Sequence, residues 1–358
     1  MDIGIIGLEN TGKTTIFNAL TGLSVEVTSY SLKDSKPNTA VVKLKDQRID
    51  YLNSIFQPEK LKYATMNITD MPAISEEERE NWGTKVVEFA KNIDVILEIV
   101  RYFNREDVIY RFPEPDPLRD ILTLDSEIMF SDYSIIEKRL QRLEKKKGNL
   151  VGDEKREFPL LERLKQSLEN EIPLRTLSLS EQDLHLLKGY NLLSLKPLLI
   201  VINRGEETID EGTKKQVEDL GEKLNFGVVD MCGELEMEIN QLDEAERAEY
   251  MEELGVSESA IEIVKKATFN RLGLISFFTV GKDEVKAWPI KKGTTAQKAA
   301  GKIHSDIEKG FIKAQVVHFN DFKNNPDFGV LKEKGLLKLE GKDYIVEDGD
   351  IIEFRFNV

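Results

Sequence analysis

The sequence is poor in cysteine and in long apolar stretches. Cys232 is the single cysteine among 358 residues, which excludes a disulfide framework within the chain and fits a reducing compartment. No segment reaches the roughly 18 consecutive apolar residues that a membrane span needs. The N-terminus lacks a basic segment followed by an apolar one, so we expect no signal peptide. These absences predict a soluble cytoplasmic protein without a membrane partner.

Positive charge is also scarce, but it is unevenly distributed. The chain has 50 Lys and Arg against 65 Asp and Glu, a net charge of −15. An acidic total argues against nucleic acid, because phosphate binding depends on clustered Lys and Arg. Residues 271–358 nevertheless hold 15 basic and 13 acidic residues, which leaves −17 on the preceding 270. This predicts an acidic body with a mildly basic C-terminal part. RNA remains a possible partner of that part, and we expect no DNA partner.

Apolar runs that alternate with helical patterns predict an α/β fold. The length of 358 residues corresponds to two or three domains. Continuous Val, Ile and Leu strands of this kind form largely parallel sheets covered on both faces. The expected strands cover residues 1–6, 40–44, 66–70, 95–100 and 198–202, with a helix at about 82–92.

Residues 129–168 carry a different pattern. Apolar residues spaced by three and four recur at Met129, Tyr133, Ile136, Leu140 and Leu143, and again at Leu161, Leu164 and Leu168. A polar stretch separates the two groups, which favours an antiparallel helical hairpin of coiled-coil type. Two ordinary amphipathic surface helices are the alternative. From about Ser276 onward, short strands and turns with one helix near 295–311 predict a compact α+β module, and we place His304 within that helix.

Residues 7–14 read GLENTGKT and match the phosphate-binding pattern G-x-x-x-x-G-K-[ST]. The motif follows a strand and precedes a helix, which is the context it requires. Its glycines let backbone N–H groups face phosphate oxygens, Lys13 reaches the β- and γ-phosphates, and the Thr14 hydroxyl coordinates Mg²⁺. The predicted nucleotide-binding residues here are Glu9, Asn10, Thr11, Gly12, Lys13, Thr14 and Thr15, and Lys13 is also assigned a catalytic role.

Two further positions fit a nucleotide site. Asp70 ends a strand where a second, water-mediated Mg²⁺ ligand is expected, although aspartates at strand ends also serve as helix caps. Asn203-Arg204-Gly205-Glu206 follows the most apolar strand, where GTPases carry N-K-x-D, whose aspartate binds guanine. Glu206 is one methylene longer than that aspartate. A polar turn after a buried strand is the alternative interpretation of these four residues.

Together these motifs resemble the YchF or Obg-like ATPases, a branch of the translation-factor-class P-loop GTPases. The resemblance covers nearly the whole chain. It includes GLENTGKTTIFNALTG from residue 7, EKRLQRLEKK from residue 137 and N-x-x-E at residues 203–206. Its most specific portions are GLISFFTVGKDEVKAW from residue 273, KKGTTAQKAAGKIHSDIEKGFIKA from residue 291 and LEGKDYIVEDGDIIEFRFNV from residue 339.

The resemblance implies a split nucleotide-binding domain at 1–122 and 193–275, a helical coiled-coil insertion at 123–192, and a C-terminal TGS domain of β-grasp form at 276–358. It also implies slow hydrolysis with ATP preferred over GTP, Mg²⁺ as cofactor, and association with ribosomes or ribosomal RNA through the TGS and helical parts. Asn203 carries over as a base contact, and Glu206, Cys232 and Gly233 as further residues of the base-binding loops.

Several residues depart from the family pattern in the switch regions. Asp34 stands where the family has a threonine that contacts Mg²⁺ and the γ-phosphate, and we include Asp34 among the metal ligands. Ala73 replaces the glycine that senses the γ-phosphate, and the acidic residues Glu76 to Glu78 replace a glycine-rich stretch. Ile74 takes the place of the glutamine that orients water in Ras-like enzymes. We therefore expect slow hydrolysis. As a separate expectation, the protein is a monomer.

Three functions remain open from the sequence. The first is a Mg²⁺-dependent nucleoside-triphosphatase that acts on or near the ribosome. The second is a nucleotide-stabilised adaptor with impaired hydrolysis, which binds its partner through the helical and TGS parts. The third is a GTP-selective switch.

Overall fold

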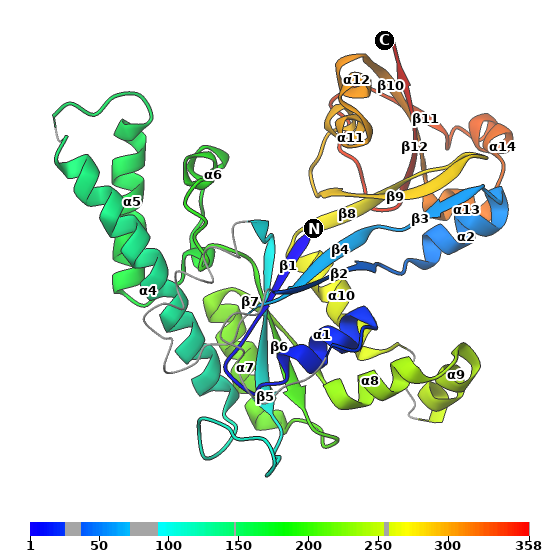
Figure 1. The fold of residues 1–358 in the computed structure, drawn as a ribbon. Coiled ribbons are helices and arrows are strands. Elements are labelled where there is room, and N and C mark those ends of the chain that lie inside the picture. Colours follow the sequence, from blue (N-terminus) through cyan, green and yellow to red (C-terminus); the bar gives the residue numbers. More distant parts are fainter. Residues whose placement is uncertain (26–36, 72–91, 147, 254–257, 358) are drawn as a thin grey trace. The chain divides into compact units, whose positions relative to one another are not determined.

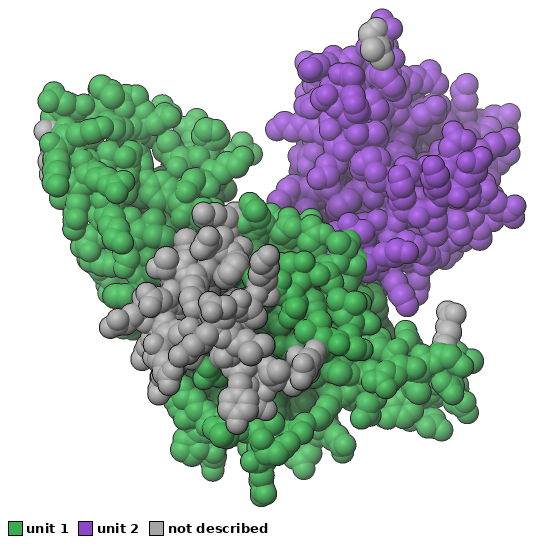
Figure 2. All heavy atoms as spheres, viewed as in Figure 1, with its two compact units in different colours: residues 1–42, 67–268 green, residues 43–66, 269–358 purple. Residues whose placement is uncertain are grey.

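A computed structural model describes residues 1–25, 37–71, 92–146, 148–253 and 258–357. The chain divides into two compact units (Figure 2). Unit 1 comprises Met1–Val42 and Asn67–Thr268, and unit 2 comprises Lys43–Met66 and Phe269–Val358. Sequence analysis assigns residues 43–66 to the nucleotide-binding domain, whereas here they pack with the C-terminal residues. No helix in the described ranges combines the length and the apolar character needed to cross a membrane.

Unit 1 is built on a six-stranded sheet of order β2-β4-β1-β5-β6-β7 (Figure 1). Strand β1 pairs in parallel with β4 and β5, and β5, β6 and β7 continue the parallel register. The strands are β1 Asp2–Ile6, β2 Asn38–Lys43, β4 Thr65–Asp70, β5 Val95–Tyr102, β6 Leu198–Arg204 and β7 Phe226–Met231. Nearly every residue of β1, β5 and β6 is buried, as expected for parallel strands covered on both faces. The α/β prediction is confirmed.

Among the described residues, five helices connect or flank these strands. They are α1 Lys13–Thr21, α7 Glu211–Leu224, α8 Gly233–Gln241, α9 Glu244–Glu253 and α10 Ala260–Arg271. Helix α1 follows β1 directly, and helix α8 follows β7 and packs against α1. The N-termini of both helices therefore lie at the carboxyl edge of the sheet, where open α/β sheets bind their ligands.

A long helical excursion within unit 1 lies between β5 and β6 in the chain. It contains α4 Pro117–Glu144, α5 Glu154–Glu169, the short 3₁₀ helix η2 Leu174–Thr176 and α6 Glu181–Leu187. Helices α4 and α5 lie side by side (Figure 1) and share one apolar cluster. All the residues of the predicted seam belong to this cluster, with Tyr133 partly buried and the others buried. The expectation of two helices packed along one apolar face agrees with this arrangement.

Buried polar contacts hold the base of this excursion together and attach it to helix α7. Arg175 and Asp125 form an ion pair of which each side chain is at most 3% exposed, and Arg175 Nε donates to Leu224 O at 2.9 Å. Asp132 accepts hydrogen bonds from the backbone N–H groups of Leu193 and Ser194 at 2.9 and 2.7 Å. Burial raises the pKa of Asp132 to about 6. Because unpaired buried charges are costly, these bonds fix where the excursion begins and ends.

Unit 2 contains a second six-stranded sheet, of order β11-β10-β12-β8-β9-β3. Its strands are β3 Lys60–Lys62, β8 Leu274–Thr279, β9 Glu284–Lys291, β10 Phe311–His318, β11 Lys338–Glu340 and β12 Asp350–Phe356. The helices of this unit are α2 Gln47–Phe56, α11 Ala296–Ile303, α12 Ser305–Lys309, α13 Phe319–Asn324 and α14 Phe328–Glu333. Strand β3 pairs with β9 in parallel, and the Phe56 ring stacks on Phe322 at 5.5 Å between centroids. The two segments of unit 2 thus share a sheet and an aromatic contact.

The single helix predicted near 295–311 is wrong. The structure has two helices, α11 and α12, and His304 stands between them with an extended backbone (φ −161°, ψ 142°). His304 Nδ1 accepts a hydrogen bond from the Asp306 backbone N–H at 3.2 Å, so this side chain caps the second helix. A side chain that accepts from the backbone two residues ahead competes with helix continuation, which is why the helix breaks there.

Candidate nucleotide-binding site

The loop between β1 and α1 requires glycine at two positions. Gly7 has φ 156°, and a Cβ on this residue would stand 2.6 Å from the Ile99 carbonyl oxygen. Gly12 has φ 86°, and a Cβ there would collide with the side-chain amide of Asn203. Both values lie in the region of φ that favours glycine. The loop therefore holds its backbone close to β5 and to Asn203.

Lys13 is the first residue of α1, and its buried ammonium group reaches back into this loop. Its Nζ donates to the carbonyl oxygens of Leu8 at 2.8 Å and Gly7 at 3.2 Å. Burial lowers the pKa of Lys13 to about 8, while the nearby carboxylates of Asp70 and Glu9 act in the opposite direction. A phosphate placed against Nζ would supply negative charge, which the two neutral carbonyl partners of the ammonium do not. The geometry suits an anion.

Thr14 and Asp70 come together across the loop. The Thr14 hydroxyl donates to Asp70 Oδ2 at 2.9 Å. Asp70 is 9% exposed, and its other oxygen, Oδ1, is buried without a hydrogen-bond partner among the described residues. Burial raises the pKa of Asp70. Because a buried oxygen without a partner is costly, this pair fits a hard cation such as Mg²⁺, held by the Thr14 hydroxyl and by Asp70.

No group of three or more His, Cys, Asp or Glu side chains that could hold a metal occurs within the described parts of the chain. A magnesium site here would therefore take most of its ligands from phosphate oxygens and water, as Mg²⁺ sites usually do. We call residues 7–15 together with Asp70 the phosphate end of the site.

Asn203, at the end of β6, connects two loops of the site. Its Nδ2 donates to Thr11 O at 3.0 Å, and its Oδ1 accepts from the Gly233 backbone N–H at 3.1 Å. The side chain is 5% exposed. One amide thus ties the phosphate-binding loop to the N-terminus of α8. We call residues 203–206, 232 and 233 the base end of the site.

Arg204 does not point toward the phosphate-binding loop. Its Nε donates to Asp230 Oδ2 on β7 at 3.0 Å, and its Nη1 donates to the carbonyl oxygens of Gly205 and Glu206 at 3.0 and 3.2 Å. These bonds fix the turn after β6. Glu206 is exposed, and its carboxylate makes no hydrogen bond or ion pair with the described residues. This carboxylate is therefore available to a ligand.

Cys232 and Gly233 begin helix α8. Cys232 is buried as a free thiol, which agrees with its interpretation as a small packed residue. A Cβ on Gly233 would stand 2.7 Å from Ile16 Cδ1 and 3.3 Å from Thr15 Cγ2. Any larger residue at 233 would require the Ile16 side chain to shift. Gly233 thus acts here through close packing.

Sequence reasoning missed Phe103 and Arg101. The Phe103 ring lies 4.0 Å from the point that a Cβ on Gly12 would occupy, and its own Cβ is 3.7 Å from the corresponding point on Gly205. Arg101 is 3% exposed, covers the Phe103 ring at 4.3 Å and donates to Asn10 O at 3.3 Å. The available signal was a charged residue inside the apolar run of β5. These residues support the loop and place an aromatic ring between the two ends of the site.

The outcome for the predicted site residues is mixed. The structure brings Lys13, Thr14 and Asp70 together, and it joins Asn203 to Thr11 and Gly233. The Asn10 side chain is bonded outside the phosphate-binding loop, since its Nδ2 donates to Ile109 O at 2.7 Å. Asp34, Ala73, Ile74 and Glu76 to Glu78 lie outside the described residues.

Two family models match the chain. The 50S ribosome-binding GTPase model matches residues 2–131, and the YchF-GTPase_C model, described as a protein of unknown function, matches residues 274–357. Together they cover the phosphate end of the site and the C-terminal part of unit 2.

Similar proteins are found along the full length of the chain. Proteins called "Ribosome-binding ATPase YchF" from Haemophilus ducreyi and Bacillus subtilis are 38% and 36% identical to it, each over 99% of both chains. A solved structure of the Schizosaccharomyces pombe YchF GTPase is similar with a TM-score of 0.82 and 26% identity, over 99% of this chain and 97% of that one.

Proposed function

The chain belongs to the YchF family, and we propose that it is a Mg²⁺-dependent nucleoside-triphosphatase that hydrolyses ATP slowly and binds ribosomes. The observation that supports this most directly is the contact between Thr14 and Asp70 beside the buried ammonium of Lys13. The buried ammonium of Lys13 would pair with the anionic phosphates. The buried Asp70 oxygen that has no partner among the described residues would face the positive Mg²⁺. The relatives from Haemophilus ducreyi and Bacillus subtilis carry ATPase activity and ribosome binding in their names.

The chain's own groups bind and orient the triphosphate. Backbone N–H groups of residues 9–15 and the N-terminus of α1 face the phosphate oxygens, and Lys13 exchanges its two carbonyl partners for them. Thr14 and Asp70 would hold Mg²⁺. Such an ion would supply positive charge that stabilises the negative charge developing on the phosphate oxygens. Positioning and electrostatic stabilisation are the principal contributions of such sites.

Slow turnover is expected because the chain has no evident side chain that orients the attacking water. Ile74, at the position that carries glutamine in Ras-like enzymes, has no group that can orient a nucleophile. A loss of about 4 kcal/mol in transition-state stabilisation lowers a rate roughly a thousandfold. We therefore expect a low intrinsic rate that a bound partner raises.

Base preference is assigned to the base end of the site. Asn203 is fixed by two hydrogen bonds and serves any purine nucleotide alike. Glu206 remains exposed and unbonded, one methylene longer than the aspartate that selects guanine in N-K-x-D. We infer a preference for ATP, with GTP accepted more weakly.

The remaining domain assignments complete the proposal. Residues 123–192 are assigned to a coiled-coil insertion and residues 276–358 to a TGS domain, and both are proposed contacts with ribosomal RNA. The similarity of residues 274–357 to YchF-GTPase_C supports the C-terminal boundary. Work on ribosomes implies the cytoplasm as the site of action.

Phosphate release tests the proposal. Purified protein is incubated with ATP or GTP, with and without Mg²⁺ and ribosomes, beside Lys13→Ala as the inactive control. Slow release from ATP that requires Mg²⁺ and is absent from the control supports the proposal. Nucleotide binding without any release would favour the nucleotide-stabilised adaptor, and faster release from GTP would favour the GTP-selective switch.

A further inference from the structure

The C-terminal half of helix α4 concentrates positive charge within an acidic chain. Residues 138–147 contain six basic residues and one acidic residue. Residues 123–192 as a whole hold 12 basic and 13 acidic residues, so the excursion carries only −1 of the chain's −15. The anionic surface of the protein therefore lies mostly elsewhere.

Helical geometry sorts these basic residues into two rows. Arg139 on α4 and Lys146, two residues beyond its end, are both bonded to α5. Arg139 Nε and Nη2 donate to the two oxygens of Glu157 at 2.9 and 2.6 Å, and Lys146 Nζ pairs with Glu154 at 2.8 Å. This inner row holds the hairpin together.

The outer row consists of Lys138, Arg142 and Lys145. Spacings of four and three residues place these side chains on one face of α4, over about 10 Å of its length. All three are exposed, and no carboxylate of the described residues lies within ion-pair distance of any of them. Like charges four residues apart destabilise a helix slightly. An unpaired row of this kind is suited to an external anion.

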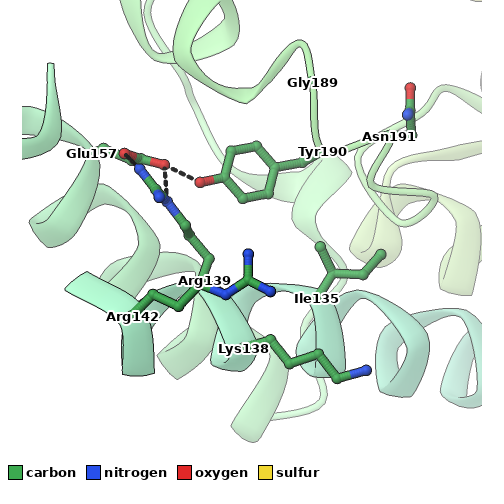
Figure 3. Close-up of a pocket in the computed structure, with 8 residues that line it drawn as sticks. All are labelled: Ile135, Lys138, Arg139, Arg142, Glu157, Gly189, Tyr190 and Asn191. Carbon is green, nitrogen blue, oxygen red and sulfur yellow. Dashed lines mark hydrogen bonds and ion pairs between the residues drawn. The ribbon is translucent and has the colours of Figure 1, made fainter. Parts of the chain in front are cut away.

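Two members of the outer row also line a pocket of about 570 Å³ between α4 and residues 189–191 (Figure 3). The single acidic residue of the pocket, Glu157, is saturated, because it accepts from Arg139 and also from the Tyr190 hydroxyl. Arg142 points into the pocket and takes part in none of these bonds. The pocket therefore combines two free cations with the edge of a tyrosine ring.

We propose that the outer row and this pocket form a phosphate-binding face for RNA, in which the row follows successive backbone phosphates and the pocket receives a phosphate or a base beside Tyr190. This inference rests on the proposed association with ribosomes and names the face that makes it. RNA is favoured over an acidic protein because cations in a line beside an aromatic ring match a phosphate backbone with its bases.

The test compares two triple variants of the full-length chain. Lys138→Ala, Arg142→Ala and Lys145→Ala together remove the outer row. Lys214→Ala, Lys215→Ala and Lys223→Ala together remove three lysines of helix α7 that have no ion pair in the described structure. The melting temperatures of both variants are expected to match the wild type, since none of the six side chains holds the fold.

Binding is measured to purified ribosomes by pelleting and to a labelled 20-nucleotide single-stranded RNA by fluorescence anisotropy, each at several salt concentrations. The outer-row variant is expected to bind RNA roughly tenfold to hundredfold more weakly, with the slope of log K against log salt reduced by about 2, as three lost phosphate contacts require. The control variant is expected to keep the wild-type affinity and slope.

Each of the other outcomes contradicts either the proposed function or the RNA-binding face. Wild-type protein that does not pellet with ribosomes contradicts the proposed function. Wild-type binding to ribosomes that the outer-row variant retains, with an unchanged salt slope, leaves the proposed function intact and overturns the RNA-binding face. Loss of ribosome binding by that variant without any change in RNA binding points to an acidic protein instead and also overturns it.

Discussion

The phosphate end and the base end of the site use their side chains differently. At the phosphate end Lys13, Thr14 and Asp70 are buried or half-buried and bonded to one another or to the loop. At the base end Asn203 is equally fixed, whereas the Glu206 carboxylate is exposed and unbonded. We therefore expect binding strength to come from protein groups that contact the triphosphate, which is the same in ATP and GTP. Preference between bases then depends on one exposed carboxylate.

Removal of the ammonium group should have the largest effect. Lys13→Met is expected to weaken ATP and GTP binding by roughly a hundredfold or more, since two charge-assisted hydrogen bonds to phosphate are worth about 3 kcal/mol or more. The free protein should lose little stability, because the cost of burying the ammonium is removed with its two carbonyl bonds. Calorimetric titration and thermal unfolding measure the two effects, with Lys155→Met as the control. Wild-type affinity in Lys13→Met would mean that the loop does not bind phosphate.

Loss of the amide that joins the two ends should affect stability and both nucleotides. Asn203→Ala leaves the Thr11 carbonyl and the Gly233 N–H without their partner, which should lower the free energy of unfolding by about 2–4 kcal/mol. Affinity for ATP and GTP should fall by similar factors, measured by titration beside urea unfolding.

Asn240→Ala is the matched control for this variant, because its amide makes one hydrogen bond, to Ala19 O at 2.7 Å. It should cost about 1 kcal/mol and leave nucleotide binding unchanged. A selective loss of one nucleotide in Asn203→Ala would show that the amide discriminates between bases, against the comparison above.

Affinity for ATP should depend on pH through Lys13. Its pKa is lowered to about 8 in the free protein, and bound phosphate raises it again. Above pH 8 binding must therefore take up a proton, and affinity should fall by up to about tenfold per pH unit. The free energy of unfolding of the free protein should instead rise with pH. The unfolded chain retains this proton up to about pH 10.5, so the contribution of Lys13 becomes less unfavourable as pH rises from 8.

Titrations at pH 7, 8 and 9 in two buffers of different ionisation enthalpy measure this proton uptake. The same experiment on Lys13→Met should show none. An affinity that stays constant from pH 7 to 9 would indicate that Lys13 keeps its proton in the free protein.

A change at Glu206 should have the smallest effect and alter preference alone. Glu206→Asp shortens the carboxylate to the length found in N-K-x-D, and it should move the ATP-to-GTP affinity ratio toward GTP by about fivefold, the worth of one hydrogen bond. The melting temperature should not change. Glu207→Asp, at the adjacent exposed position, is the control. An unaltered ratio in Glu206→Asp would remove Glu206 from the base contacts.

The sequence predicted the elements that are encoded locally. Strands β1, β5 and β6 are continuous apolar runs, and the loop at residues 7–14 combines two glycines with a lysine in a fixed pattern. Each is specified by residues adjacent in the chain, so one sequence is enough to find it. The seam of α4 and α5 was found for the same reason.

Features that depend on distant residues could not be found in this way. Strand β3 is only three residues long, and it is a strand because Lys60–Lys62 pairs with Glu284–Lys286 of β9. The support of Asn10 by Arg101 depends equally on tertiary context. A single sequence contains the residues of such contacts but not their partners.

Parallel calorimetric titrations of the full-length protein with ATP and with GTP, in the presence of Mg²⁺, test the central claim most directly. Both nucleotides are expected to bind at one site, with ATP bound more tightly than GTP. Failure of both nucleotides to bind, or a clear preference for GTP, would contradict it.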